Sequence, residues 1–381
     1  MNLPKHIPQL DVLRGAAVLA VMLYHAADLG PALHLRPLVH LGYTGVDLFF
    51  VLSGFLITGI LVQSKDGPGY FKSFYARRAL RIWPLYYALL FFTFAMLPLL
   101  RPSLGGAIFE RSHPWQSFPF FLQNLMANGQ GAFDTVRVTW SLAIEEQFYL
   151  VWPVIVWLAP RRALKPLALS ALFLSVAARW SVLYGLTPPV NIYTNTLTRL
   201  DGLALGAFLA LWIPEKDSRT VRRAGIAMVA VTLPVALAIA WFESGHWSFY
   251  ALVSASFAGM LCVGINTPAL SHLRFMKYTG KISYGLYLVH VPVFALASAS
   301  TFPRFLFPHS PVTADAVLFV VSFALCYAVA AASWHFYESK FLRWKSRFEY
   351  AIARPAAAHA GAQGARDSHP GEEQPHPLIS E

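Results

Sequence analysis

Charged side chains are scarce in this sequence. Asp, Glu, Lys and Arg make up 13% of its 381 residues, whereas soluble domains carry about 25%. Hydrophobic residues make up 56%, and the mean hydropathy is +0.49. So little charge excludes an ordinary soluble domain, and we expect an integral membrane protein.

Cysteine, a cleavage site and a concentrated basic patch are also scarce or missing. Cys262 and Cys326 both lie in apolar runs, so we expect core or lipid-facing thiols rather than catalysts. Arg14 interrupts the first apolar run and no small-x-small site follows it, which favours an uncleaved span over a signal peptide. The net charge of +11 is spread between apolar segments, so nucleic acid is not an expected partner.

Apolar stretches of about 20 residues, the length that a helix needs to cross a bilayer, occur ten times. They lie near 10–29, 42–63, 82–100, 140–159, 163–184, 194–213, 224–243, 248–267, 282–300 and 312–334. The sequence therefore predicts an all-α, polytopic membrane bundle of about ten helices. Residues 115–126 are too short and proline-broken to span, and we expect an interfacial or re-entrant piece there.

Basic residues concentrate in every second gap between these stretches. Cytoplasmic loops carry such an excess, so we expect both termini in the cytoplasm. We assign residues 1–341 to a membrane domain and 342–381 to a cytoplasmic basic flank with a disordered tail, because the last residues are rich in Ala, Pro, His and Gly.

The first stretch carries ionisable side chains at membrane depth, where they are costly and usually functional. Arg14 and His25 are eleven residues apart, so a helix returns them to within about 20° of one face. They stand about 16 Å apart along the axis. One helix therefore holds a cation toward the cytoplasm and a titratable base toward the outside.

Other polar residues are expected at the depth of His25. Glu145 and Glu146 are adjacent, so only one of them can face a common site. A set of purely structural ion pairs would give the same pattern, and a lone histidine in a span can simply be packed. The residues that we place near an acceptor on this basis are Asp47, Arg199, Asp201 and His290.

The cytoplasmic side has a different composition. The segment FKSFYARRALRIWPLYY mixes arginines with aromatic residues, and guanidinium groups bind phosphates through two parallel hydrogen bonds. A basic cluster that only sets topology or touches anionic lipid is the alternative. The segment GKISYGLYLVH adds polar residues at the same membrane face. The candidate anion-binding residues are Arg14, Arg77, Arg78, Arg81, Lys281, Ser283 and Tyr284.

The motifs LDVLRG, GYTGVDLFFVLSGFLI, FYARRALRIWPLYY, TWSLAIEEQFYLVWP, RLDGLALGAFLA, GKISYGLYLVH and HFYESKF follow one another in order. Together they resemble the acyltransferase-3 family of integral membrane O-acyltransferases. The resemblance implies transfer of an acyl group from acyl-CoA to a hydroxyl, usually on a glycan or glycolipid. It maps the family's Arg-x10-His motif onto Arg14 and His25, and its arginine motif onto Arg78 and Arg81.

Many relatives carry an extra esterase-like domain, and none is expected here. The ending Tyr337–Phe341 departs from the family's usual pattern and leaves the role of Glu338 open.

These observations predict a mechanism in the cell's inner membrane. His25 is the expected general base for the acceptor hydroxyl, and Glu145 or Glu146 would orient it or hold the acceptor. Acyl-CoA, with acetyl as the expected group, would dock at the cytoplasmic arginines, and no metal is required. Two alternatives remain open. One is the same chemistry on a small molecule such as an antibiotic. The other is a transporter, although no inverted repeat is evident.

Overall fold

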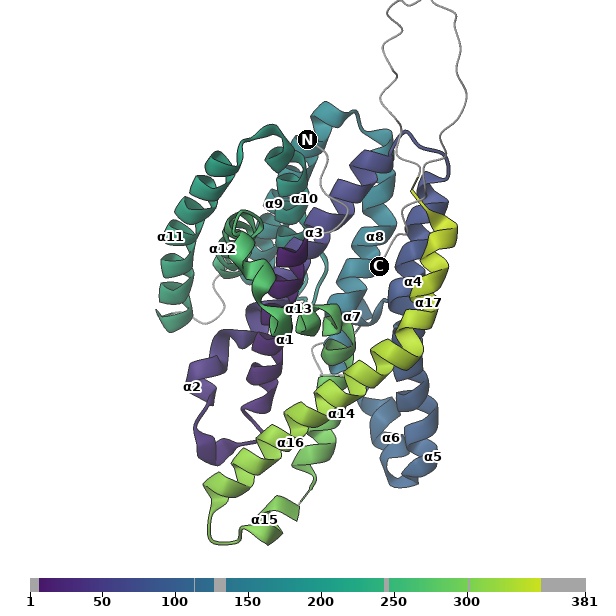
Figure 1. Cartoon of the computed structure of the whole chain (residues 1–381), viewed down its shortest axis with the longest axis vertical. Coiled ribbons are helices and arrows are strands. Elements are labelled where there is room, and N and C mark those ends of the chain that lie inside the picture. Colours follow the sequence, from purple (N-terminus) through teal and green to yellow (C-terminus); the bar gives the residue numbers. More distant parts are fainter. Residues whose placement is uncertain (1–6, 113, 127–134, 243–246, 301, 351–381) are drawn as a thin grey trace, which may run out of the picture.

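The computed structural model describes residues 7–112, 114–126, 135–242, 247–300 and 302–350. Every regular element in these ranges is helical, which confirms the predicted all-α class. Most of the long helices run along the long axis of the molecule (Figure 1).

Each predicted apolar stretch corresponds to a helix. These helices are α1 (Pro8–Ala26), α3 (Gly45–Ser64), α4 (Tyr70–Phe91), α8 (Trp140–Leu158), α9 (Arg161–Leu183), α10 (Leu200–Trp212), α11 (Ser218–Phe242), α12 (Phe249–Ile265), α14 (Ser283–Ser298) and α16 (Pro311–Ala332). Among the described residues, seven helical segments are long and apolar enough to cross a membrane. An eighth is added if α13 (Arg274–Lys281) and α14, bent by 75°, form one span. The multi-pass class is thus supported, while the number ten stays a prediction.

Two helices extend beyond their predicted ends. The basic segment before residue 82 belongs to α4, which continues through the π-helical turn η3 (Phe92–Met96) into α5 (Leu97–Leu100). In this segment Tyr70 and Phe74, one helical turn apart, are buried in the core. Helix α16 continues through η9 (Ser333–Glu338) and α17 (Ser339–Arg343) into η10 (Trp344–Phe348).

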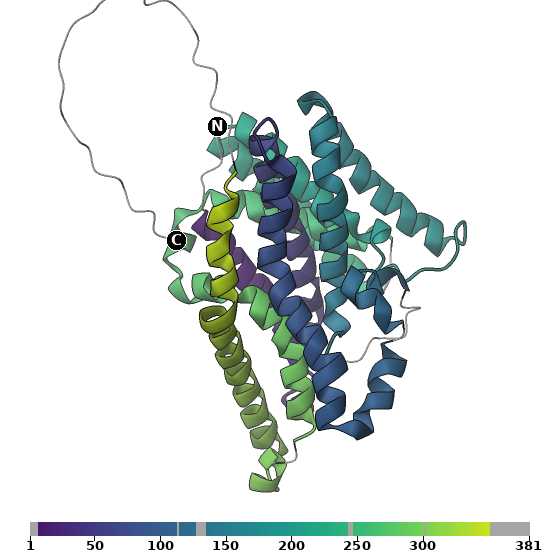
Figure 2. The ribbon, with the colours of Figure 1, turned by 90° about the vertical axis from the view of Figure 1, so that its right-hand side faces the viewer.

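The expected boundary after Phe341 therefore falls inside α17, which lies alongside α4 (Figure 2). Residues 351–381, most of the expected tail, lie outside the described residues.

Short elements connect the long helices. The segment expected to be interfacial forms η4 (Trp115–Phe120) and α7 (Gln123–Met126), which pack near α4 and α8. The other connecting elements are η1 (Pro31–Leu33), α2 (Arg36–Val39), η2 (His40–Thr44), α6 (Pro102–Arg111), η5 (Arg137–Thr139), η6 (Leu197–Arg199), η7 (Ile213–Glu215), η8 (Pro268–His272) and α15 (Phe302–Leu306).

Close helix packing holds the centre of the molecule together. A Cβ atom on Gly54 of α3 would lie 2.0 Å from the carbonyl oxygen of Leu203 in α10. One on Gly206 of α10 would lie 2.1 Å from the carbonyl oxygen of Val51. These glycines therefore serve helix contact, as small residues commonly do in membranes. Helix α1 packs against α3, α13 and α14, so His25 lies on a central helix.

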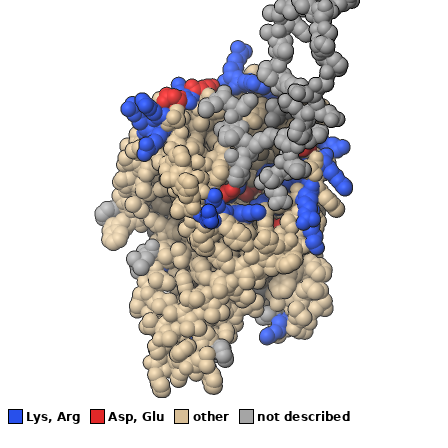
Figure 3. Space-filling view, in the orientation of Figure 1, with Lys and Arg blue, Asp and Glu red and all other residues tan. Residues whose placement is uncertain are grey.

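Lysine and arginine gather toward one end of the molecule on the face seen in Figure 3, and the opposite half of that face is mostly uncharged. The positive-inside rule predicts that this basic end faces the cytoplasm.

Candidate active site

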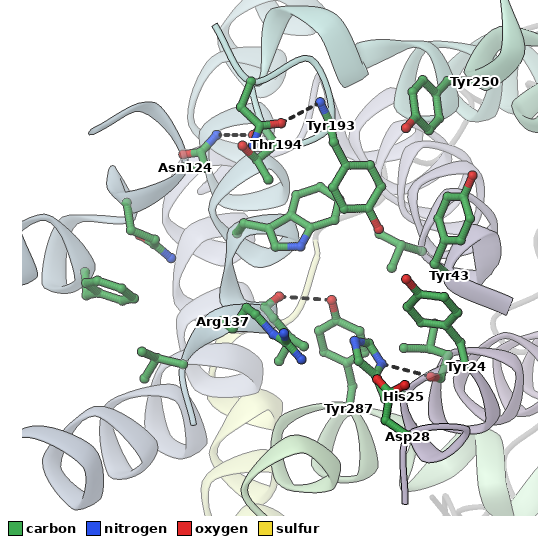
Figure 4. A pocket seen from close by; sticks show the side chains of 18 of the residues that line it. Tyr24, His25, Asp28, Tyr43, Asn124, Arg137, Tyr193, Thr194, Tyr250 and Tyr287 are labelled. Atoms are coloured by element: carbon green, nitrogen blue, oxygen red, sulfur yellow. Dashed lines mark hydrogen bonds between the residues drawn. The ribbon is translucent and has the colours of Figure 1, made fainter. Parts of the chain in front are cut away.

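A cavity of about 580 Å³ lies beside the last turn of α1 (Figure 4). Helices α1, α3, α8, α12 and α14 contribute to its lining, together with the segment around α7 and the loop before η6. Aromatic side chains dominate the wall: Tyr24, Tyr43, Trp140, Tyr193, Tyr250 and Tyr287. Four neutral polar residues, Gln123, Asn124, Asn191 and Thr194, also line it, together with three charged ones, Asp28, Arg36 and Arg137. An apolar pocket with a few polar groups is the usual form of a small-molecule site.

His25 lines this cavity, and its backbone contact fixes its tautomer. Its Nδ1 lies 3.0 Å from the carbonyl oxygen of Val21, one helical turn earlier. A carbonyl oxygen only accepts, so the proton of the neutral imidazole sits on Nδ1 and the lone pair on Nε2. Nε2 is therefore the atom of His25 that can accept a proton.

His290 of α14 is a second neighbour of His25 Nδ1. Its Nε2 lies 3.3 Å from Nδ1 of His25, and its own Nδ1 lies 3.2 Å from the carbonyl oxygen of Leu286. The second contact places the proton of His290 on Nδ1, which makes its Nε2 an acceptor. The Nδ1–H group of His25 thus faces two acceptors, and both would stabilise the imidazolium that forms when Nε2 is protonated.

The two glutamates of α8 point to different partners. Glu145 accepts a hydrogen bond of 2.5 Å from Ser53, whose hydroxyl also lies 2.9 Å from the hydroxyl of Tyr149. Glu146 accepts a bond of 3.1 Å from the indole of Trp83. The structure therefore pairs Glu145 with Ser53 in α3 and gives His25 a second histidine as its side-chain neighbour.

The predicted acceptor residues Asp47, Arg199 and Asp201 lie behind the cavity wall. Arg199 pairs with Asp47 at 2.8 Å, and Arg179 pairs with Asp201 at 3.0 Å. All four side chains are completely buried, and none of them lines the cavity. The structural interpretation that the sequence left open, a set of buried ion pairs, describes their contacts.

Several predicted donor residues already have protein partners. Arg14 pairs with Asp11 at 3.1 Å, and Arg77 donates to the carbonyl oxygens of Lys345 and Phe348. Arg81 lies 3.9 Å from Glu338, which gives that glutamate a role in joining η9 to α4.

Aromatic rings also contact two of the predicted donor residues, Arg81 and Lys281, and the remaining two, Tyr284 and Ser283, are bonded to backbone or buried. Arg81 lies over the rings of Tyr284 and Trp334. Lys281 lies over Trp334, at 5.2 Å. The Tyr284 hydroxyl donates to the carbonyl oxygen of Ile82. Ser283 is buried at the start of α14.

Arg78 differs from its neighbours. Its Nε is buried and has no hydrogen-bond partner among the described residues. Its charge lies close enough to act on Glu145, Glu146 and Tyr149. Of the predicted anion-binding residues, Arg78 is the one whose environment most resembles an incomplete binding site.

Sequence reasoning missed most of the cavity wall. Tyr193 and Thr194 come from a loop, Tyr250 from the start of α12, and Arg137 from η5. No local spacing relates these residues, because tertiary packing brings them together. The polar and aromatic run NIYTNT at 191–196 was the available signal, since such a run is unusual beside a membrane span.

The motifs that suggested a family are matched by a model of that family. A model described as an acyltransferase domain matches residues 7–331. The chain belongs to this acyltransferase family. No solved structure matches the chain significantly.

The chain is similar to proteins named as peptidoglycan O-acetyltransferases. It is 31% identical over 329 residues to a putative peptidoglycan O-acetyltransferase, YrhL, of Bacillus subtilis, covering 77% of this chain and 49% of that protein. It is 31% identical over 326 residues to the peptidoglycan O-acetyltransferase OatA of Listeria monocytogenes, covering 77% and 50%. The O-acetyltransferase OatA of Staphylococcus aureus is 28% identical, with 78% and 52% covered. The chain spans about half the length of these relatives.

Proposed function

We propose that this protein transfers an acetyl group from acetyl-CoA to a hydroxyl of a cell-surface glycan, at the cytoplasmic membrane. The observation that carries the proposal is His25, a histidine with its Nε2 lone pair available, on the wall of an aromatic cavity in a member of an acyltransferase family. A hydroxyl is a poor nucleophile at neutral pH, and such a base is what it needs.

The reaction replaces the carbon–sulfur bond of the thioester by a carbon–oxygen bond to the acceptor, and one proton moves from the hydroxyl to the thiolate. The acceptor oxygen attacks the thioester carbonyl carbon while His25 Nε2 takes the hydroxyl proton. The tetrahedral intermediate then collapses, the carbon–sulfur bond breaks, and the departing thiolate takes the proton back from His25. His290 and the Val21 carbonyl oxygen hold the imidazolium between these steps, the role that an acid plays in acyl-transfer triads.

The lining of the cavity supports a sugar acceptor. Flat tyrosine and tryptophan rings stack on the C–H faces of pyranose rings, and amide and hydroxyl groups bond to sugar hydroxyls. Both kinds of group line the cavity. The rings of Trp140 and Tyr193 lie 4.7 Å apart between centroids, and the side-chain amide of Asn124 donates to the backbone carbonyl oxygen of Thr194. The relatives are named for peptidoglycan, which makes a peptidoglycan glycan chain the first acceptor to test.

The basic end supports an anionic donor from the cytosol. The partnerless Nε of Arg78 suits a phosphate oxygen of coenzyme A, because guanidinium–phosphate bonds are strong and directional. Arg14, Arg77, Arg81 and Lys281 would add positive potential while keeping their protein contacts.

The proposal is tested with the purified protein in lipid nanodiscs. Acetyl-CoA and muramidase-released peptidoglycan oligosaccharides are supplied, and mass spectrometry follows alkali-labile acetyl esters on the sugar. We expect ester and free coenzyme A in equal amounts. Acetylation of small molecules but never of glycans would overturn the proposed glycan acceptor. Absence of acyl transfer from acetyl-CoA to any hydroxyl would overturn both the proposed donor and the proposed reaction.

A further inference from the structure

A buried arginine stands behind the aromatic wall of the cavity. The guanidinium carbon of Arg199 lies 4.1 Å from the ring centroid of Tyr250, 5.0 Å from that of Tyr193 and 5.6 Å from that of Trp140. Its Nη2 donates to Asp47 at 2.8 Å. We call Arg199, Asp47 and these three rings the arginine cage.

The three rings of the arginine cage also form part of the cavity wall. Tyr193, Tyr250 and Trp140 line the cavity, whereas Arg199 and Asp47 do not. Each ring therefore contacts the cation and also borders the space where we place the acceptor. The cation can set the ring positions without lining the cavity itself.

Ring contacts continue from the cage to the proposed base. Tyr193 meets Tyr43 at 5.9 Å between centroids, Tyr43 meets Tyr24 at 5.5 Å, and Tyr24 meets His25 at 5.1 Å. Aromatic pairs at these distances have preferred geometries. A shift of the Tyr193 ring would therefore change the shape of the cavity around the reacting hydroxyl.

Stability alone does not explain a charge pair at this place. Burying two ions costs desolvation, and replacement of such a pair by apolar residues of similar volume is often neutral or stabilising. A desolvated cation among aromatic faces does gain cation–π energy, which orders the rings around it. Arg179 fixes the surroundings further, because it pairs with Asp201 and donates to the carbonyl oxygens of Thr198 and Trp247.

We propose that Arg199 is a positioning residue for the acceptor: its cation, held by Asp47, fixes Tyr193, Tyr250 and Trp140 as the surface on which a sugar ring stacks. Arg199 itself touches neither substrate. This inference rests on the proposed function for the identity of the acceptor.

The decisive variant removes both charges together. Asp47→Leu with Arg199→Met replaces the pair by apolar side chains, so no unpaired charge is left buried and the protein is expected to fold. We expect the acceptor KM for peptidoglycan oligosaccharides to rise about tenfold or more, with a much smaller change in kcat and none in acetyl-CoA affinity. Arg199→Lys keeps the charge and should recover part of the loss.

Arg161→Met is the matched control, because it removes an exposed pair with Asp66 on a helix end outside the cavity lining. Its acceptor KM should equal that of the wild type. A folded Asp47→Leu/Arg199→Met protein with wild-type acceptor KM would overturn the positioning role and leave only a structural ion pair.

Coupling provides the second measurement and covers a failure to fold. The loss of acceptor-binding free energy, calculated from KM, should be smaller in the Tyr250→Leu/Arg199→Lys double variant than the sum of the losses in the two single variants. Both changes act on one ring, so their effects are coupled. Strictly additive effects would contradict the proposal. Calorimetric binding of the oligosaccharide gives the same comparison without turnover. The positioning role of Arg199 can therefore be tested even if the wild-type protein does not carry out the proposed reaction.

Discussion

Two histidines from distant parts of the sequence meet at the cavity, and their contacts assign different roles to them. His25 has its Nδ1 proton directed at Val21 and His290, while His290 has its own Nδ1 proton directed at Leu286. The lone pair that can accept a proton from a group in the cavity belongs to Nε2 of His25. His290 is a positioning residue, which holds the imidazole and stabilises its charged form.

His290→Phe keeps a ring of similar shape and removes the acceptor nitrogen. We expect acetyl transfer to fall by about 10–100-fold, less than the 10²–10⁴-fold usual for loss of a general base. His290→Gln should retain more activity, since its amide oxygen can accept the same hydrogen bond. Initial rates with saturating acetyl-CoA check this order, and His290→Phe equal to wild type would contradict the role.

Arg78→Ala should weaken acetyl-CoA binding by about 1.5–3 kcal/mol, the range for hydrogen bonds to charged groups. Lysine should restore part of it, because it lacks the planar fork. Arg81→Ala is the informative comparison: it leaves Glu338 buried without its cation, so we expect a lower Tm as well. Calorimetric acetyl-CoA titration and thermal melts separate these effects, and unchanged affinity in folded Arg78→Ala would remove Arg78 from the donor site.

At the residue scale, the sequence predicted that Arg14 and His25 share one helix, and α1 confirms this, because spacing within a helix determines geometry. The role of His25 as the base stays a prediction. The contact between His25 and His290 spans 265 positions and depends on how α14 packs against α1. No periodicity within either helix contains that information.

At the element scale, hydrophobic length predicted where the helices are, because a bilayer requires about 20 apolar residues whatever the fold. It misplaced the start of α4 and the end of the α16 segment, since both continue as helices past the apolar stretch. Their polar ends are stabilised by contacts with each other, such as that between Arg77 and Lys345. Polar helix ends that depend on tertiary contacts give no hydropathy signal.

The contact between α3 and α10 gives a prediction with an internal control. Gly206→Ala would place a methyl group 2.1 Å from a backbone oxygen, so the helices must separate. We expect destabilisation of about 1–3 kcal/mol, as for overpacked cores. Gly106→Ala in α6 has nothing within 4 Å of the new atom and should leave stability unchanged. Thermal melts in detergent check both, and equal Tm values for the two variants would contradict close packing.

At the scale of the whole molecule, orientation determines which substrate reaches which end. The predicted topology places Lys216 and Arg347 in the cytoplasm and Gly106 outside, and all three positions are exposed. Single cysteines there can be labelled with a membrane-impermeant maleimide in intact cells, because the native Cys262 and Cys326 are buried. We expect labelling at position 106 alone. Labelling at 216 or 347 from outside would invert the map and exclude a cytosolic donor at the arginines.

Purified His25→Ala tests most directly whether His25 is the base that activates the acceptor hydroxyl. Acetyl transfer to the oligosaccharide is measured beside calorimetric acetyl-CoA binding, with a thermal melt to check folding. If His25 is this base, transfer falls by about 10²–10⁴-fold while acetyl-CoA affinity stays at the wild-type value. Wild-type transfer by folded His25→Ala protein would contradict this role.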